Sequence, residues 1–426
     1  MKNSKLLLIA AVSTASILLA SCGTDSSADT ATASSSVTAS SEAHDHDGHE
    51  AEGSSTAVEV SSPQARIVTT YDGGIITLDA NTLEVLDDTE LAGFNRLNSA
   101  GNGRHVFVST GGGFQLFDTG AWTEPHGDHT HSYTATPELT DITYSTDKPG
   151  HVVNHAGKTV LFGDGDGKIQ IFDTASLLKG DEVEPEIKNA LEAHHGVAVV
   201  LENGDLLHTL GDEDSRNGAV VFNAAGEEIA RNEQCPGVHG ESAALGDAIA
   251  VGCEDGVLIY KDGEFTKVQA PDSYGRIGNQ SGSNISPVVL GDYKVDKDAD
   301  LERPERVSLT NTETGELTLV DLGTSYSFRS LGRGPAGEAV VLGTDGALHI
   351  IDANTGSVTN TYPVIDAWTE PEVWQEARPT LFINKDRAYV SDPSNNELHV
   401  VDLANGNIFA SATLPGTPNE LTGVSG

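Results

Sequence analysis

Three histidines fall within six residues, in the segment Pro125-His126-Gly127-Asp128-His129-Thr130-His131. In an extended backbone, His129 and His131 point to the same side. His126 can fold back toward them through the Gly127-Asp128 turn. Three neutral imidazoles could then reach one metal ion, with Asp128 as a fourth ligand or as the carboxylate that orients an imidazole. The alternative is a polar loop whose histidines are solvated.

A second histidine-rich motif, His44-Asp45-His46-Asp47-Gly48-His49-Glu50, lies near the N-terminus. His44, His46 and His49 form a low-complexity metal-binding pattern. The surrounding residues, 22–62, are almost all small, polar or acidic, so we expect a disordered tether. A site there would have to be assembled on binding, and we therefore expect these three histidines to be transient ligands.

The rest of the chain, residues 63–426, repeats a strand, a turn opened by Asp or Asn, and another strand. The turn-opening positions are Asp79, Asp118, Asp173, Asn223, Lys261, Asn311, Asp352 and Asp402, spaced on average 323/7 or about 46 residues apart. A strand-only repeat of this length predicts an all-β chain folded as a single β-propeller. Eight copies indicate eight blades, with seven as the alternative. The final residues, 419–426, could supply the strand that the first copy lacks.

Several further histidines precede the first strand of a repeat, where positions from different blades converge on the axial channel. They are His194 and His195 in Ala193-His194-His195-Gly196, and His239 in Val238-His239-Gly240-Glu241. His155, like His151, lies near such an entrance. We expect His194, His195, His239 and His155 to be additional metal ligands. For each one, the alternative is a histidine hydrogen-bonded to a neighbouring carbonyl.

Imidazole combined with carboxylate favours Zn(II), Cu(II), Ni(II) or iron. Cu(I) prefers sulfur ligands, but Met1 is the sole methionine and Cys235 and Cys253 form a pair that predicts a disulfide in an oxidising compartment. Calcium and magnesium prefer oxygen ligands. Zinc is therefore the expected ion, with Cu(II) and Ni(II) as alternatives.

The N-terminus predicts export. Lys2 and Lys5 precede an apolar run from Leu6 to Ala20, and Leu19-Ala20-Ser21-Cys22 resembles a bacterial lipobox. We expect residues 1–21 to be a signal peptide and Cys22 to carry a lipid that anchors the protein on the outer or periplasmic side of a membrane. The formal net charge of −40 argues against nucleic acid and against electrostatic membrane binding, so the lipid would be the only membrane contact.

The histidine motifs and the propeller repeat resemble exported zinc metallochaperones of the AztD type, which act beside ABC zinc importers. His44, His46 and His49 match the family's N-terminal motif, and the segment 124–131 matches its histidine-rich propeller loop. The resemblance implies a protein, expected to be monomeric, that binds zinc and passes it to the solute-binding protein of an importer.

Two other functions fit the repeat. One is a scaffold for protein interaction with incidental histidines, for which Ala-Trp-Thr-Glu-Pro, at 121–125 and again at 367–371, would form equivalent loops. The other is a propeller enzyme. Asp352-Ala353-Asn354-Thr355-Gly356 resembles part of a quinoprotein docking motif, but Asn360 stands where that motif needs tryptophan, and the acidic motifs of lactonases do not recur. We therefore expect no enzyme activity.

Overall fold

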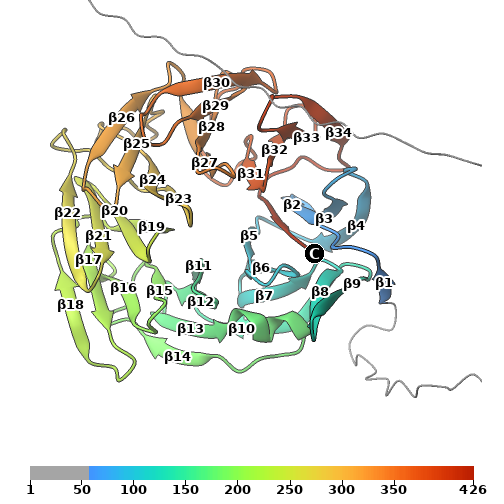
Figure 1. Ribbon diagram of the computed structural model, residues 1–426, viewed down its shortest axis with the longest axis horizontal. Coiled ribbons are helices and arrows are strands. Elements are labelled where there is room, and N and C mark those ends of the chain that lie inside the picture. Colours follow the sequence, from blue (N-terminus) through green and yellow to red (C-terminus); the bar gives the residue numbers. More distant parts are fainter. Residues whose placement is uncertain (1–56) are drawn as a thin grey trace, which may run out of the picture. The chain divides into compact units, whose positions relative to one another are not determined.

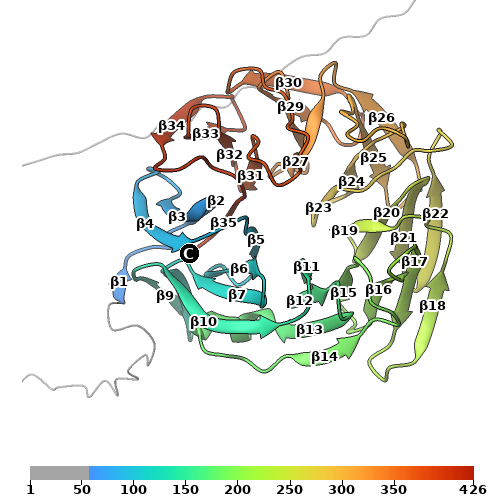
Figure 2. The same ribbon diagram turned by 180° about the vertical axis from the view of Figure 1, so that it is seen from behind.

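The structure, a computed structural model, describes residues 57–426, and these residues form an eight-bladed β-propeller. Eight four-stranded antiparallel sheets surround a central axis, which Figure 1 and Figure 2 show from opposite faces. The predicted fold class and the preferred number of blades are confirmed. Residues 1–56, with the predicted signal peptide, Cys22 and the motif His44, His46 and His49, lie outside the described residues.

Blades are numbered here in chain order. Blade one contains β2 (Arg66–Tyr71), β3 (Gly73–Asp79) and β4 (Val85–Leu91), and blade two contains β5 (Arg96–Ser99), β6 (His105–Thr110), β7 (Gly113–Asp118) and β10 (Glu138–Ser145). Blade three contains β11 (Pro149–His155), β12 (Lys158–Gly163), β13 (Lys168–Asp173) and β14 (Glu186–Asn189). Blade four contains β15 (Ala198–Val200), β16 (Leu206–Gly211), β17 (Arg216–Phe222) and β18 (Glu228–Asn232). A short 3-10 helix, η1 (Thr174–Lys179), joins β13 to β14.

Blade five contains β19 (His239–Ala244), β20 (Ala248–Cys253), β21 (Gly256–Lys261) and β22 (Glu264–Gln269), and blade six contains β23 (Gln280–Ser283), β24 (Ser286–Asp292), β25 (Arg306–Asn311) and β26 (Leu317–Asp321). Blade seven contains β27 (Tyr326–Arg333), β28 (Ala339–Gly343), β29 (Ala347–Ile351) and β30 (Val358–Pro363). Blade eight contains β31 (Leu381–Asn384), β32 (Arg387–Asp392), β33 (Glu397–Asp402) and β34 (Ile408–Thr413). Three further strands are β1 (Val58–Val60), β8 (Ala121–His126) and β9 (His129–Thr134), and β35 (Leu421–Val424) ends the chain.

The ring closes through the C-terminus, as predicted. Strand β35 is the innermost strand of blade one and pairs antiparallel with β2, Arg66 lying opposite Val424 and Thr69 opposite Leu421. Both ends of the propeller sequence therefore belong to one sheet, and closure removes the free edge that an open ring would leave.

The repeated Asp and Asn residues form the turns between the third and fourth strands. A carboxylate oxygen of Asp79 accepts hydrogen bonds from the backbone N–H groups of Asn81 and Thr82, and Asp352 does the same with Asn354 and Thr355. A side chain that replaces a backbone acceptor stabilises a tight turn, which explains the residue type at this position of the repeat.

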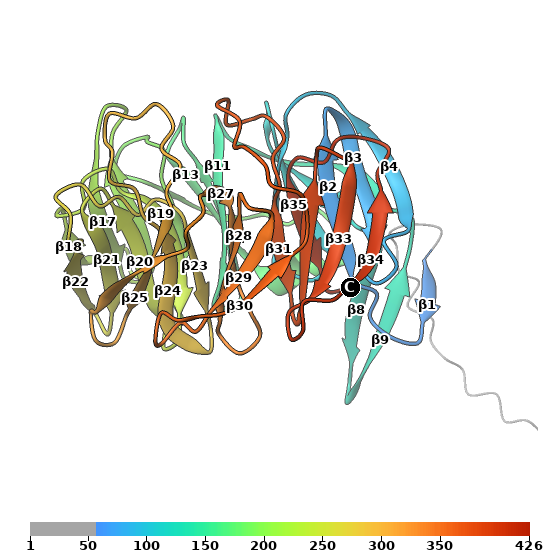
Figure 3. The same cartoon turned by 90° about the horizontal axis from the view of Figure 1, so that it is seen from above.

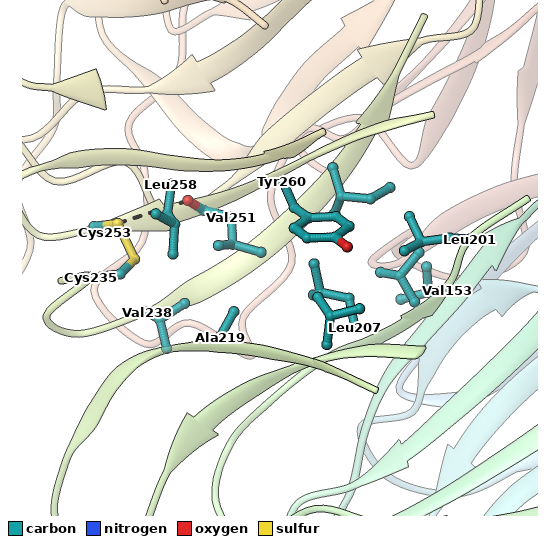
Figure 4. Packing of buried hydrophobic residues seen from close by; sticks show 13 residues of the cluster. Val153, Leu201, Leu207, Ala219, Cys235, Val238, Val251, Cys253, Leu258 and Tyr260 are labelled. Atoms are coloured by element: carbon teal, nitrogen blue, oxygen red, sulfur yellow. Dashed lines mark hydrogen bonds between the residues drawn. A yellow bond between two sulfur atoms is a disulfide. The ribbon is translucent and has the colours of Figure 1, made fainter. Parts of the chain in front are cut away.

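The core lies between neighbouring blades. Figure 4 shows the layer between blades four and five, where Leu207 and Ala219 face Val251 and Leu258, all fully buried or nearly so. The predicted disulfide is present there: Cys235 is bonded to Cys253 on β20. It fixes the segment that leads into β19.

Strands β8 and β9 form a hairpin inserted between the third and fourth strands of blade two, β7 and β10. In an antiparallel blade, this connection lies at the end opposite to the start of the first strand. Figure 3 shows the hairpin extending beyond one face of the ring. The insertion explains the longest interval of the repeat, 55 residues between Asp118 and Asp173.

Two sequence expectations need correction. The predicted tether, 22–62, is wrong at its C-terminal end, because Val58–Val60 form β1 and pair with β9. Composition could not show that a polar segment would find a strand edge to pair with. The two Ala-Trp-Thr-Glu-Pro copies are not equivalent loops either. Residues 121–125 lie in β8, in the hairpin inserted between two strands of blade two, whereas 367–371 lie between β30 and β31, in the connection between two blades. Within residues 57–426, no helix is long and apolar enough to cross a membrane.

Candidate metal centres

The base of the β8–β9 hairpin is anchored by aromatic packing. Trp122 is 3% exposed and stacks on Tyr133 across the hairpin, with ring centroids 5.4 Å apart. The Arg104 guanidinium, in the turn between β5 and β6, lies 3.9 Å from the Trp122 ring and forms a salt bridge with Asp118. The tip projects from a fixed base, so its side chains are held in register by the hairpin.

His126, His129 and His131 converge at this tip and form the hairpin cluster. His126 and His129 are directly paired across the turn, where Gly127 has a φ of 62°, in the left-handed region that favours glycine. His129 Nε2 lies 3.0 Å from His131 Nε2 and 3.3 Å from His126 Nδ1. The predicted folding back of His126 is therefore seen.

A second group, the channel cluster, consists of His151, His195 and His239. They come from three consecutive blades: His151 from β11, His195 from the segment before β15, and His239 from the first residue of β19. His195 Nε2 lies 3.1 Å from His239 Nε2, and the His151 ring centroid is 5.1 and 5.7 Å from the other two. The three histidines lie at or near the start of the first strand of their blades. This end of a blade is opposite to the end that carries the hairpin, so the channel cluster lies at the other face of the ring.

In both clusters an oxygen acceptor fixes the histidine tautomer. The Gly278 carbonyl can only accept, so His239 Nδ1, 2.7 Å away, carries the proton and Nε2 presents a lone pair. Asp164 Oδ2 accepts a hydrogen bond from His195 Nδ1 at 2.5 Å and leaves the lone pair of that ring on Nε2 as well. At the hairpin, Asp128 accepts from His129 Nδ1 at 3.2 Å and Glu59 from His131 Nδ1 at 2.6 Å. Each cluster thus has two Nε2 lone pairs facing each other.

Facing lone pairs repel unless a cation lies between them. For a tetrahedral ion with metal–nitrogen bonds of about 2.0–2.1 Å, neighbouring ligand atoms are about 3.3 Å apart. The nitrogen separations of 3.0–3.3 Å in the hairpin cluster and 3.1 Å in the channel cluster are close to this value. The side chains of both clusters are therefore arranged to bind a transition-metal ion, and their Nδ1 acceptors orient the ligating rings.

The channel cluster is the more enclosed. Burial lowers the pKa of His239 to about 3 and that of His151 well below its usual value, and the neighbouring imidazoles act in the same direction. Glu241, on β19, lies 3.8 Å from His151 Nδ1, and burial raises the pKa of its carboxyl to about 8. Neutral imidazoles are the metal-binding form, so burial keeps these rings ready to bind.

His195 and His239 line a cavity of about 1170 Å³. Its charged lining consists of six carboxylates and three basic side chains: Asp164, Glu192, Asp212, Glu213, Asp214, Glu254, Lys148, Arg216 and Arg276. The lining has more negative than positive charges and so favours cations in the cavity, whereas Arg216 and Arg276 lie close enough to His239 to help lower its pKa.

The structure places His194 and His155 outside both clusters and Asp128 beside one ring of the hairpin cluster. His194 is buried, with Nδ1 bonded to the Glu192 carbonyl and Nε2 to the Thr209 hydroxyl, and burial lowers its pKa. His155 lies at the other end of β11 and pairs with Asp247 at 2.6 Å. Asp128 is fully exposed and contacts the far side of the His129 ring, the position of an orienting carboxylate.

Sequence reasoning placed His151 near a blade entrance without assigning it to a site. One signal could have found it: His151, His195 and His239 are each separated by 44 residues, close to the average repeat. Equal spacing in a ring of blades places equivalent residues side by side.

The fold and the two clusters together define an eight-bladed propeller with two histidine centres. The chain is 27% identical over 363 residues to the zinc chaperone AztD of Citrobacter koseri, a match covering 81% of this chain and 84% of the relative. No family model matches the chain.

Two solved structures of the same relative confirm the fold. The crystal structure of Citrobacter koseri AztD superposes with a TM-score of 0.73 at 24% identity, covering 86% of this chain and 99% of that one. The structure of apo AztD gives 0.71 at 24% identity, covering 85% and 98%. The resemblance to AztD-type proteins inferred from the sequence motifs is thus confirmed.

Proposed function

We propose that the protein is a zinc metallochaperone that holds Zn(II) on the hairpin and channel clusters and passes it to another protein. One observation carries the proposal: in each cluster, two Nε2 lone pairs are held about 3 Å apart, and oxygen acceptors fix the tautomers that make them lone pairs. The similarity to a protein named zinc chaperone, rather than to an enzyme, supports the same function.

Zinc suits these ligands better than the alternatives. The donors are neutral imidazole nitrogens with carboxylates close by, and zinc accepts an irregular set of three such ligands plus one open position. Cys235 and Cys253 are joined in a disulfide, so neither can supply the thiolate that Cu(I) would need. Cu(II) and Ni(II) bind imidazole as well, so they are the competitors to test.

We propose further that the recipient is the solute-binding protein of an ABC zinc importer, and that export and lipidation of Cys22 place the chaperone beside it. The hairpin cluster is exposed at the tip of a projecting hairpin, so an incoming protein can offer ligands to its ion without displacing a blade. Transfer would proceed by replacing one imidazole at a time. His44, His46 and His49 would act as intermediate ligands in that exchange.

The test is the metal content of the protein purified without a histidine tag, followed by transfer. We expect two zinc ions per chain in the propeller, and delivery to the solute-binding protein in the presence of a chelator that removes free zinc. Cu(II) and Ni(II) are compared at equal free concentration. Absence of stoichiometric zinc, or transfer that the chelator abolishes, would refute the proposal.

A further inference from the structure

Strand β1 belongs to none of the eight blades. It pairs with the outer edge of β9, Val58 lying opposite Thr134 and Val60 opposite Ser132, and forms a three-stranded sheet with the hairpin. Figure 3 shows it beside β9, away from the ring. The strand has three residues and Val58 is 61% exposed, so little apolar burial holds it in place.

One side chain of β1 reaches the hairpin cluster. Glu59 Oε1 lies 2.6 Å from His131 Nδ1, a distance typical of a charge-assisted hydrogen bond. Since the carboxylate accepts, Nδ1 carries the proton and His131 Nε2 is left to face His129 Nε2 at 3.0 Å. A residue 72 positions away in the sequence thereby sets the ligand atom of His131.

We propose that Glu59 is a positioning residue of the hairpin cluster, and that metal binding there and pairing of β1 with β9 stabilise each other. The inference rests on the proposed function, because it takes the hairpin cluster to be a zinc site. It assigns β1 a role in metal binding rather than in the stability of a blade.

The coupling has a simple physical origin. A metal ion on Nε2 withdraws electron density from the ring and makes Nδ1–H a stronger donor to Glu59. If Glu59 strengthens metal binding by some factor, the metal strengthens docking of β1 by the same factor, because linkage is reciprocal. Orienting partners of this kind typically change metal affinity by about 10–100-fold.

The experiment uses the full chain in a background that isolates the hairpin, with His44, His46, His49, His151, His195 and His239 changed to alanine. Zinc affinity is measured for Glu59→Ala and Glu59→Gln. The matched control is Glu316→Ala, which removes an exposed carboxylate in blade six. Hydrogen exchange of the peptide that contains 58–60 is followed with and without zinc.

We expect Glu59→Ala to weaken zinc binding 10–100-fold and Glu59→Gln to weaken it less, since the amide oxygen still accepts a hydrogen bond. Zinc should slow exchange in β1, and His131→Ala should abolish that protection. Affinity of Glu59→Ala within twofold of the control, or exchange in β1 that saturating zinc leaves unchanged, would overturn the coupling alone. If the background chain itself takes up no zinc, the proposed function of the hairpin is refuted as well.

Discussion

The hairpin cluster and the channel cluster have the same ligand chemistry and opposite construction. Each has three imidazoles, a pair of Nε2 atoms about 3 Å apart, and oxygen acceptors on Nδ1. The hairpin cluster comes from six consecutive residues on one exposed hairpin. The channel cluster comes from three blades, 44 residues apart each time, and two of its histidines line an acidic cavity at the other face.

This difference in construction predicts different rates of metal release from the two clusters. An ion at the hairpin is open to attack by outside ligands from several directions. An ion in the channel would lie beside the cavity that His195 and His239 line, and its ligands come from three blades, so fewer outside ligands can reach it at once. We therefore expect the hairpin to release its ion faster, and the channel to hold its ion longer.

The strongest test removes each cluster in turn. The triple variant His126→Ala, His129→Ala, His131→Ala and the triple variant His151→Ala, His195→Ala, His239→Ala should each lose one zinc ion per chain. Chelator-induced release, followed by stopped flow, should lose its fast phase in the first variant and its slow phase in the second. Equal release rates in the two variants would contradict the comparison.

The two regions also differ in what the sequence could predict. The hairpin was predictable because its three histidines are neighbours, and an i, i+2 spacing on a strand determines which way side chains point. The repeat predicted the ring because seven of its eight turn-opening residues are Asp or Asn, as at Asp79 and Asp352. The closing strand followed from the incomplete first repeat.

What the sequence did not predict depends on contacts between distant residues. His194 and His195 are adjacent and look alike in the sequence, but only the ring shows that His194 turns to Thr209 while His195 meets His239. In the same way, nothing in the composition of the segment that contains Glu59 showed that it would meet His131.

A smaller effect concerns the orienting carboxylate of the channel. Asp164→Asn replaces the charged acceptor of His195 Nδ1 with a neutral amide oxygen that can still accept, so zinc affinity at the channel should fall by less than the roughly 10–100-fold expected when such an acceptor is removed. The measurement is a chelator competition titration in the variant that lacks the hairpin histidines. Asp214→Asn, which changes another carboxylate of the same cavity, is the control. A loss of equal size in the control would show that the general negative charge, and not the orientation of His195, sets the affinity.

The smallest expected effect is a pH dependence of stability that reports burial in the channel. In the metal-free folded protein the pKa of His239 is about 3, whereas in the unfolded chain it is about 6.5. Between these values the unfolded chain binds a proton that the folded protein does not, so the free energy of unfolding falls as the pH is lowered, by about 1.4 kcal/mol per pH unit for this one group.

His239→Gln removes the titrating ring while its side-chain amide can still donate to the Gly278 carbonyl. We expect the variant to show a shallower loss of unfolding free energy between pH 6.5 and 4, measured by urea denaturation after removal of metal. Ser242→Ala, on the same strand β19, adds or removes no titrating group and should keep the slope of the unchanged protein. If His239→Gln has that same slope, proton binding to His239 is not suppressed by folding. The channel cluster would then be as open to solvent as the hairpin, and the expected difference in release would lose its physical basis.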